Sequence, residues 1–176
     1  MEKRPVIYAF IDGNNLKYGV SSDLSDKNGK IIYKGWELDY RKFRLYLKNK
    51  YGVSKAYLFI GHVPGNESLY SSLQEMDYIL VFKPTIPFNN NGVRDTKGNV
   101  DAELVLYASA LTYDKYDQAI LVSSDGDFYC LIEYLHYKDK LLTILSPSNR
   151  YSSLLRKYAH KIVTVGQFKD KLERTK

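Results

Sequence analysis

The sequence predicts a single α/β domain in which helices cover both faces of a mostly parallel β-sheet. Short β-type runs alternate with helical patterns along the chain, and the apolar cores of these runs are nearly continuous. Continuous apolar strands are typical of a sheet that is buried on both sides. The chain has 176 residues, of which 44% are hydrophobic and 26% charged, so it can bury such a core without disulfides. No linker or internal repeat divides it, and we therefore expect one domain over 1–176.

The strands are predicted from short runs rich in β-branched, aromatic and leucine residues. The first such run, VIYAFI, is followed by an aspartate and a glycine, which end it. We expect strands at 6–11, 56–60, 78–82, 119–123, 141–145 and 162–165.

The helices are predicted between these runs, where apolar residues recur at spacings of three and four. In the third helix, for example, Leu104, Ala108 and Leu111 follow this spacing. We expect helices at 39–51, 68–76, 100–112, 127–137 and 152–159.

Two longer segments interrupt the alternation. Residues 21–35 are polar and contain glycine, which fits a hairpin or a mobile loop, and residues 84–98 are too long for a simple connection. Long loops in a compact α/β domain often face the substrate. The core should span about 6–165, and 169–176 should be a charged tail that frays at the end of a helix.

Composition excludes several classes of protein. The single cysteine, Cys130, cannot form an internal disulfide or a cysteine-rich zinc site. The apolar run near the N-terminus is interrupted by Asp12 and Asn14, so it is too short for a signal peptide, and no segment approaches the length of a membrane span. We therefore expect a cytoplasmic protein that does not bind membranes. The three histidines are scattered, and we expect structural or surface roles for them.

The net charge of +6 favours an anionic partner, and the chain also contains 17 tyrosines. Cations interleaved with aromatic rings are suited to phosphate contacts and to stacking on bases. Solubility alone can give the same charge, and tyrosines also fill cores. The composition is therefore compatible with nucleic-acid binding without requiring it.

Four aspartates are placed by this topology at one edge of the sheet. Asp12 ends the first strand in a segment, FIDGNN, that we interpret as a tight turn. Asp125 and Asp127 follow the fourth strand, and Asp101 begins the helix before it. Ligands of open parallel sheets bind beyond the carboxyl ends of the strands, where all four acids should converge.

Each aspartate alone could be a turn residue or a helix N-cap. A turn or cap needs only one polar side chain, however, whereas several carboxylates at one edge repel one another unless a cation is present. Carboxylates and water are the ligands expected for Mg²⁺ or Mn²⁺. The acids therefore predict a divalent metal site.

Three motifs in this order resemble the NYN domains, a branch of the PIN-like nucleases. They are FIDGNN at 10–15, KGNVD at 97–101 and VSSDGDF at 122–128, and the match extends over about 6–165. The resemblance implies a PIN-like three-layer α/β/α sandwich and metal-dependent cleavage of RNA, which we expect to be single-stranded. It also implies that Asp12, Asp101, Asp125 and Asp127 are the catalytic acids and metal ligands.

Within this site, we take Asp12 and Asp127 first as direct ligands and Asp101 and Asp125 as ligands or as groups that orient metal-bound water. Asn15 and Ser124 are expected to support them through hydrogen bonds. We expect Lys97 and Arg94 to meet the phosphate of the substrate, although both could simply be solvated loop charges.

Three other functions compete with a ribonuclease. A noncatalytic RNA-binding or assembly module is favoured by Tyr107, because NYN domains often carry a further acid at this position. An aspartate-nucleophile phosphatase would need an acid where the chain has Asn14, and a dinucleotide-binding domain would need a glycine-rich turn after the first strand. The sequence leaves the oligomeric state open, including a homodimer.

Overall fold

The computed structural model describes residues 4–84, 86–90, 93–97 and 100–175, with side chains outside 84–99. Its centre is a parallel sheet of six described strands in the order β10-β9-β8-β1-β4-β5. The expected α/β fold with a mostly parallel sheet is confirmed. The strands are β1 (Ile7–Asp12), β4 (Val53–His62), β5 (Tyr78–Pro84), β8 (Gln118–Val122), β9 (Leu141–Ser146) and β10 (Ile162–Thr164).

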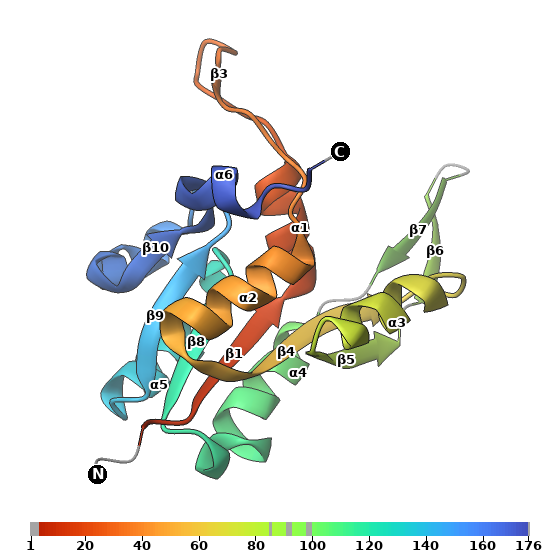
Figure 1. The fold of residues 1–176 in the computed structure, drawn as a ribbon. Coiled ribbons are helices and arrows are strands. Elements are labelled where there is room, and N and C mark those ends of the chain that lie inside the picture. Colours follow the sequence, from red (N-terminus) through yellow and green to blue (C-terminus); the bar gives the residue numbers. More distant parts are fainter. Residues whose placement is uncertain (1–3, 85, 91–92, 98–99, 176) are drawn as a thin grey trace.

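Helices cover both faces of this sheet (Figure 1). Strand β1 shows the arrangement, because Ile11 faces one apolar core and Phe10 faces the other. The first core is closed by α1 (Gly13–Ser21), α2 (Tyr40–Tyr51), α3 (Glu67–Glu75) and α6 (Lys169–Leu172). The second is closed by α4 (Asp101–Leu106), α5 (Tyr129–Tyr137) and the 3-10 segment η4 (Ser153–Lys161).

Two hairpins extend away from the sheet (Figure 1). The segment predicted as a hairpin or a mobile loop forms β2 (Leu24–Ser25) and β3 (Ile31–Tyr33), and the second long segment forms β6 (Ile86–Asn90) and β7 (Val93–Lys97). In the charged tail, α6 is followed by an antiparallel bridge between Leu38 and Glu173. None of the described helices is both long and apolar enough to cross a membrane.

The helix expected over 100–112 changes its winding halfway. After α4 the chain continues as a π-helical segment, η1 (Tyr107–Leu111). The Tyr107 carbonyl accepts hydrogen bonds from both the backbone N–H and the hydroxyl of Thr112, five residues later, at 3.0 and 2.7 Å. The helix ends after this wider turn, because the backbone of Thr112 is no longer helical.

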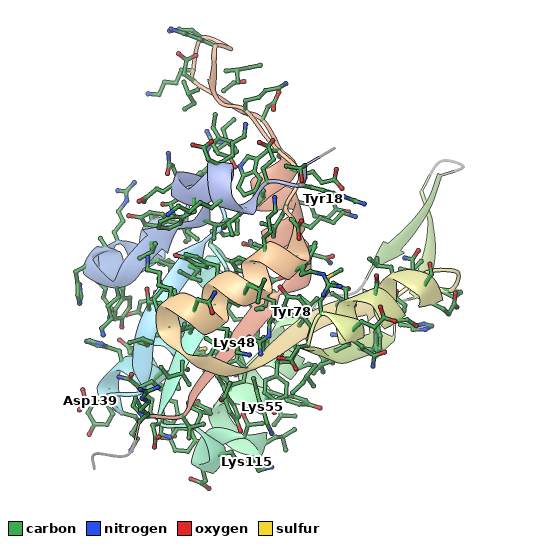
Figure 2. The ribbon with its side chains drawn as sticks, in the orientation of Figure 1. Tyr18, Lys48, Lys55, Tyr78, Lys115 and Asp139 are labelled. Carbon is green, nitrogen blue, oxygen red and sulfur yellow. The ribbon has the colours of Figure 1, made fainter. Side chains whose placement is uncertain are left out.

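Polar side chains divide between the surface and a few buried contacts. Lys48, Lys55 and Lys115 are exposed (Figure 2).

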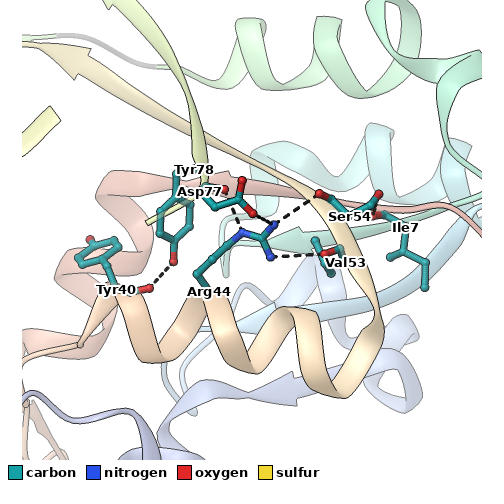
Figure 3. Close-up of polar contacts among 7 residues, drawn as sticks. All are labelled: Ile7, Tyr40, Arg44, Val53, Ser54, Asp77 and Tyr78. Atoms are coloured by element: carbon teal, nitrogen blue, oxygen red, sulfur yellow. Dashed lines mark hydrogen bonds and ion pairs between the residues drawn. The ribbon is translucent and has the colours of Figure 1, made fainter. Parts of the chain in front are cut away.

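Arg44 of α2 is only 4% exposed, and its guanidinium joins the loop before β5 to the start of β4 (Figure 3). It donates to the carbonyl and carboxylate of Asp77 at 3.0 and 2.6 Å. It also donates to the carbonyls of Val53 and Ser54 at 3.4 Å.

Candidate functional site

Asp12 lies at the carboxyl end of the central strand β1 and is 5% exposed. The segment after it is not the tight turn that we expected, because α1 begins directly at Gly13. Asp12 is the N-cap of this helix: its Oδ1 accepts from the backbone N–H of Asn15 at 3.1 Å. Gly13 is required here, since a Cβ would lie 2.4 Å from Ile60 Cγ2 and 2.8 Å from the Phe59 carbonyl oxygen. The close contact of α1 with β4 fixes the position of Asp12.

Burial raises the pKa of Asp12 from 3.8 to about 6. The negative charges of Asp101 and Asp125 raise it further, while hydrogen bonds from the Asn15 backbone and the Ser123 hydroxyl lower it in part. The largest cause is desolvation of the charged form. A carboxylate in this position is therefore costly without a nearby cation.

Two serines at the end of β8 connect the acids to α1. The Ser123 hydroxyl is 3.5 Å from Asp12 Oδ2 and accepts from the backbone N–H of Asp125 at 3.1 Å. Ser124 donates from its backbone N–H and its hydroxyl to Asn15 Oδ1 at 2.9 and 3.1 Å. Asn15 and Ser124 therefore hydrogen-bond to each other, and their role in supporting the acids stays a prediction. Ser123 was missed, although its position directly after a buried strand and before an acid is a usable signal.

The other three aspartates form a close group. One carboxylate oxygen from each of Asp101, Asp125 and Asp127 lies within 4.8 Å of the others. Asp101 begins α4, while Asp125 caps the 3-10 turn η3 (Gly126–Phe128) by accepting from the Asp127 N–H at 3.0 Å. Asp12 is not in this group of three, although its pKa responds to two of them. Asp127 therefore belongs to a close group that does not include Asp12.

This donor set is suited to a hard divalent cation. It contains only carboxylate oxygens, which match the ligand preference of Mg²⁺ and Mn²⁺. Among the described residues, no histidine or cysteine belongs to a comparable group of candidate ligands. Asp127 is exposed and the other two are half-buried, so the site is open to solvent on one side.

Tyr107 and Glu103, which follow Asp101 in the chain, have other partners. The Tyr107 ring packs on Tyr57 and Phe59, with ring centroids 5.8 and 5.5 Å away. Glu103 is paired with Lys83, with 3.6 Å between Oε2 and Nζ. The side chains of Arg94 and Lys97 lie outside the described residues, so their expected phosphate contacts stay predictions.

Comparisons with known proteins agree with this architecture. The NYN domain matches residues 7–166. The low amplitude and bright protein LabA from Synechococcus elongatus is 28% identical over 173 residues, which cover 94% of this chain and 87% of that protein. A crystal structure of a protein of unknown function from Vibrio parahaemolyticus is similar in fold, with a TM-score of 0.72 at 22% identity, and covers 99% of this chain and 100% of that chain. Since the family match spans nearly the whole sequence, the chain belongs to the NYN domain family.

Proposed function

We propose that this protein is a ribonuclease that hydrolyses RNA phosphodiester bonds with the help of Mg²⁺ or Mn²⁺. The observation that carries the proposal is the approach of Asp101, Asp125 and Asp127 within 4.8 Å of one another. Buried Asp12 stands beside them at the same edge of the sheet. Membership of the NYN family and the net charge of +6 support RNA as the substrate.

In this proposal, Asp101, Asp125 and Asp127 hold the metal, and Asp12 is a fourth ligand or holds a water molecule next to it. A bound divalent metal would lower the pKa of a water molecule and offset negative charge on the phosphate. Ser123 and Asn15 keep the carboxylates in place through their hydrogen bonds to the strand ends. Lys97 and Arg94 are proposed to contact the substrate phosphate.

A cleavage assay on a mixture of single-stranded RNAs tests this function. We expect cleavage by the wild type in Mn²⁺ or Mg²⁺, no cleavage in chelator, and a loss of at least about 100-fold in Asp12→Asn, because a ligand charge is removed. Asp139→Asn is a matched control: Asp139 is exposed, precedes β9 at the opposite edge of the sheet from the acids, and has a positive φ of 53° that asparagine tolerates. Cleavage that persists in chelator, or in Asp12→Asn, would contradict the proposed role of the acids.

A second function is favoured by Tyr107. At a position where NYN domains often carry an acid, this side chain packs against aromatic rings and supplies no carboxylate. The protein would then be a noncatalytic RNA-binding or assembly module. In the same assay, this alternative predicts intact RNA under all metal conditions together with measurable RNA binding.

A further inference from the structure

We propose that the groove beside α1 binds a nucleoside of single-stranded RNA next to the phosphate held at the acids. This inference rests on the proposed function for the identity of the strand. The groove has a volume of about 880 Å³, within the range of small-molecule sites. Its walls include Asn14, Lys17, Tyr18 and Ser21 of α1, with Leu69 and Tyr70 of α3 opposite.

Helix α1 connects the groove to the acids because it contributes residues to both. Its N-cap is Asp12, and Asn15 in its first turn holds Ser124. The residues that line the groove are spaced by three and four, so they form one stripe along the helix. A helix rises about 1.5 Å per residue, so Tyr18 lies about 6 Å beyond Asn14 along its axis. A strand bound at the acids can therefore reach the groove within about one turn of α1.

The mouth of the groove has an exposed ring and an adjacent cation. Tyr18 is 59% exposed, so its ring is accessible to a ligand. Lys17 Nζ lies 5.6 Å from the centre of the Tyr18 ring, and Lys17 has no ion pair with another described residue. An exposed aromatic ring can stack on any base, and a neighbouring cation can contact its phosphate.

The rest of the lining favours a nucleoside over an apolar peptide. Apolar residues of β4, Leu58 and Ile60, contribute to the lining, whereas α1 contributes amide, hydroxyl and ammonium groups. At the rim, Arg174 is paired with Glu37 at 2.7 Å, which leaves Lys17 as the lining cation without an ion pair among the described residues. A base binds to an apolar surface that has polar groups at its edge, and its phosphate binds to a cation. The groove provides all three.

The test is the affinity for a fluorescein-labelled oligouridine, measured by anisotropy in chelator so that no cleavage takes place. We expect Tyr18→Ala to bind about tenfold more weakly than the wild type and Tyr18→Phe to bind normally, because phenylalanine keeps the stacking surface. Tyr137→Ala is the matched control, since Tyr137 is 79% exposed and lies outside the groove. Lys17→Gln should reduce the log-log salt slope by about 0.7, whereas Lys138→Gln, also exposed, should not.

The outcomes separate this inference from the proposed function. Equal RNA affinity of Tyr18→Ala and the wild type would overturn the inference and indicate another occupant, such as a peptide, while cleavage could still take place. Failure of the wild type to bind the oligouridine would also overturn it. Tyr18-dependent binding without any metal-dependent cleavage would support the groove and contradict the proposed nuclease.

Discussion

Asp12→Asn is expected to be more stable than the wild type at pH 8 in chelator, by about 3 kcal/mol. Burial of Asp12 raises its pKa from 3.8 to about 6, and each pKa unit corresponds to about 1.4 kcal/mol. Asparagine has no charge to desolvate and is as good an N-cap as aspartate, so the hydrogen bond from Asn15 should persist. Urea denaturation of both proteins measures the difference in the free energy of unfolding.

The pH dependence of this difference identifies its cause. The pKa of Asp12 is raised in the folded state. Between about pH 4 and pH 6, the folded protein therefore keeps a proton on Asp12 that the unfolded chain has released. The wild type should lose stability relative to Asp12→Asn across this window, and the gap should be constant above about pH 7. Added Mn²⁺ should stabilise the wild type more than the variant, which keeps the other three acids but lacks the charge of Asp12.

The matched control is Asp39→Asn. Asp39 caps α2 in the same way, because its Oδ1 accepts from the Lys42 N–H at 3.0 Å. Its replacement should change stability by less than about 0.5 kcal/mol. Equal effects of the two substitutions would mean that Asp12 is an ordinary cap, and a less stable Asp12→Asn at pH 8 would contradict our account of its burial.

Arg44→Met should destabilise the fold by about 3 kcal/mol. Methionine fills a similar volume, but it leaves the carbonyls of Val53, Ser54 and Asp77 without the donors that they have in the native structure (Figure 3). The contact also holds the loop before β5, where Asp77 has a positive φ of 68°. The substitution therefore weakens the packing of α2 on the β4 and β5 edge of the sheet.

Arg41→Met on the same helix is the control, because Arg41 is exposed and should contribute less than about 0.5 kcal/mol. Urea melts of the two variants measure the difference. Comparable stabilities of Arg44→Met and Arg41→Met would show that the buried guanidinium is not a structural contact.

Strands were predictable from the sequence because each is an apolar run of limited length. The prediction of 119–123, for instance, differs from β8 by one residue at each end. The order β10-β9-β8-β1-β4-β5 was not predicted, since pairing of β1 with β8 joins segments more than 100 residues apart. Local patterns contain no information on such pairings.

Helix α1 was missed because glycine and two asparagines after Asp12 favour a turn in isolation. The buried Leu16 and Val20, four residues apart, were an available helical signal. Tertiary packing of this short helix on β4 overrides its weak propensity. The same error concealed the groove, because the stripe that lines it exists only if residues 13–21 are helical.

At the candidate site, the edge of a parallel sheet was enough to predict where the four acids would gather. The position of the edge did not show which acids lie closest together. In the structure, Asp101, Asp125 and Asp127 form the close group, and Asp12 is buried beside them. That distinction depends on side-chain burial and on the turn after β8. Neither can be read from the spacing of residues.

Anomalous diffraction from a crystal soaked in Mn²⁺ tests whether the acids at the edge of the sheet bind a metal ion. We predict a manganese peak bound by carboxylate oxygens of Asp101, Asp125 and Asp127, at about 2.0–2.4 Å. A crystal of Asp125→Asn, which can keep the hydrogen bond from the Asp127 N–H, should lack this peak under the same conditions. A wild-type map with no peak at these three carboxylates, or an equal peak in the variant, would contradict the assignment of the acids as a metal site.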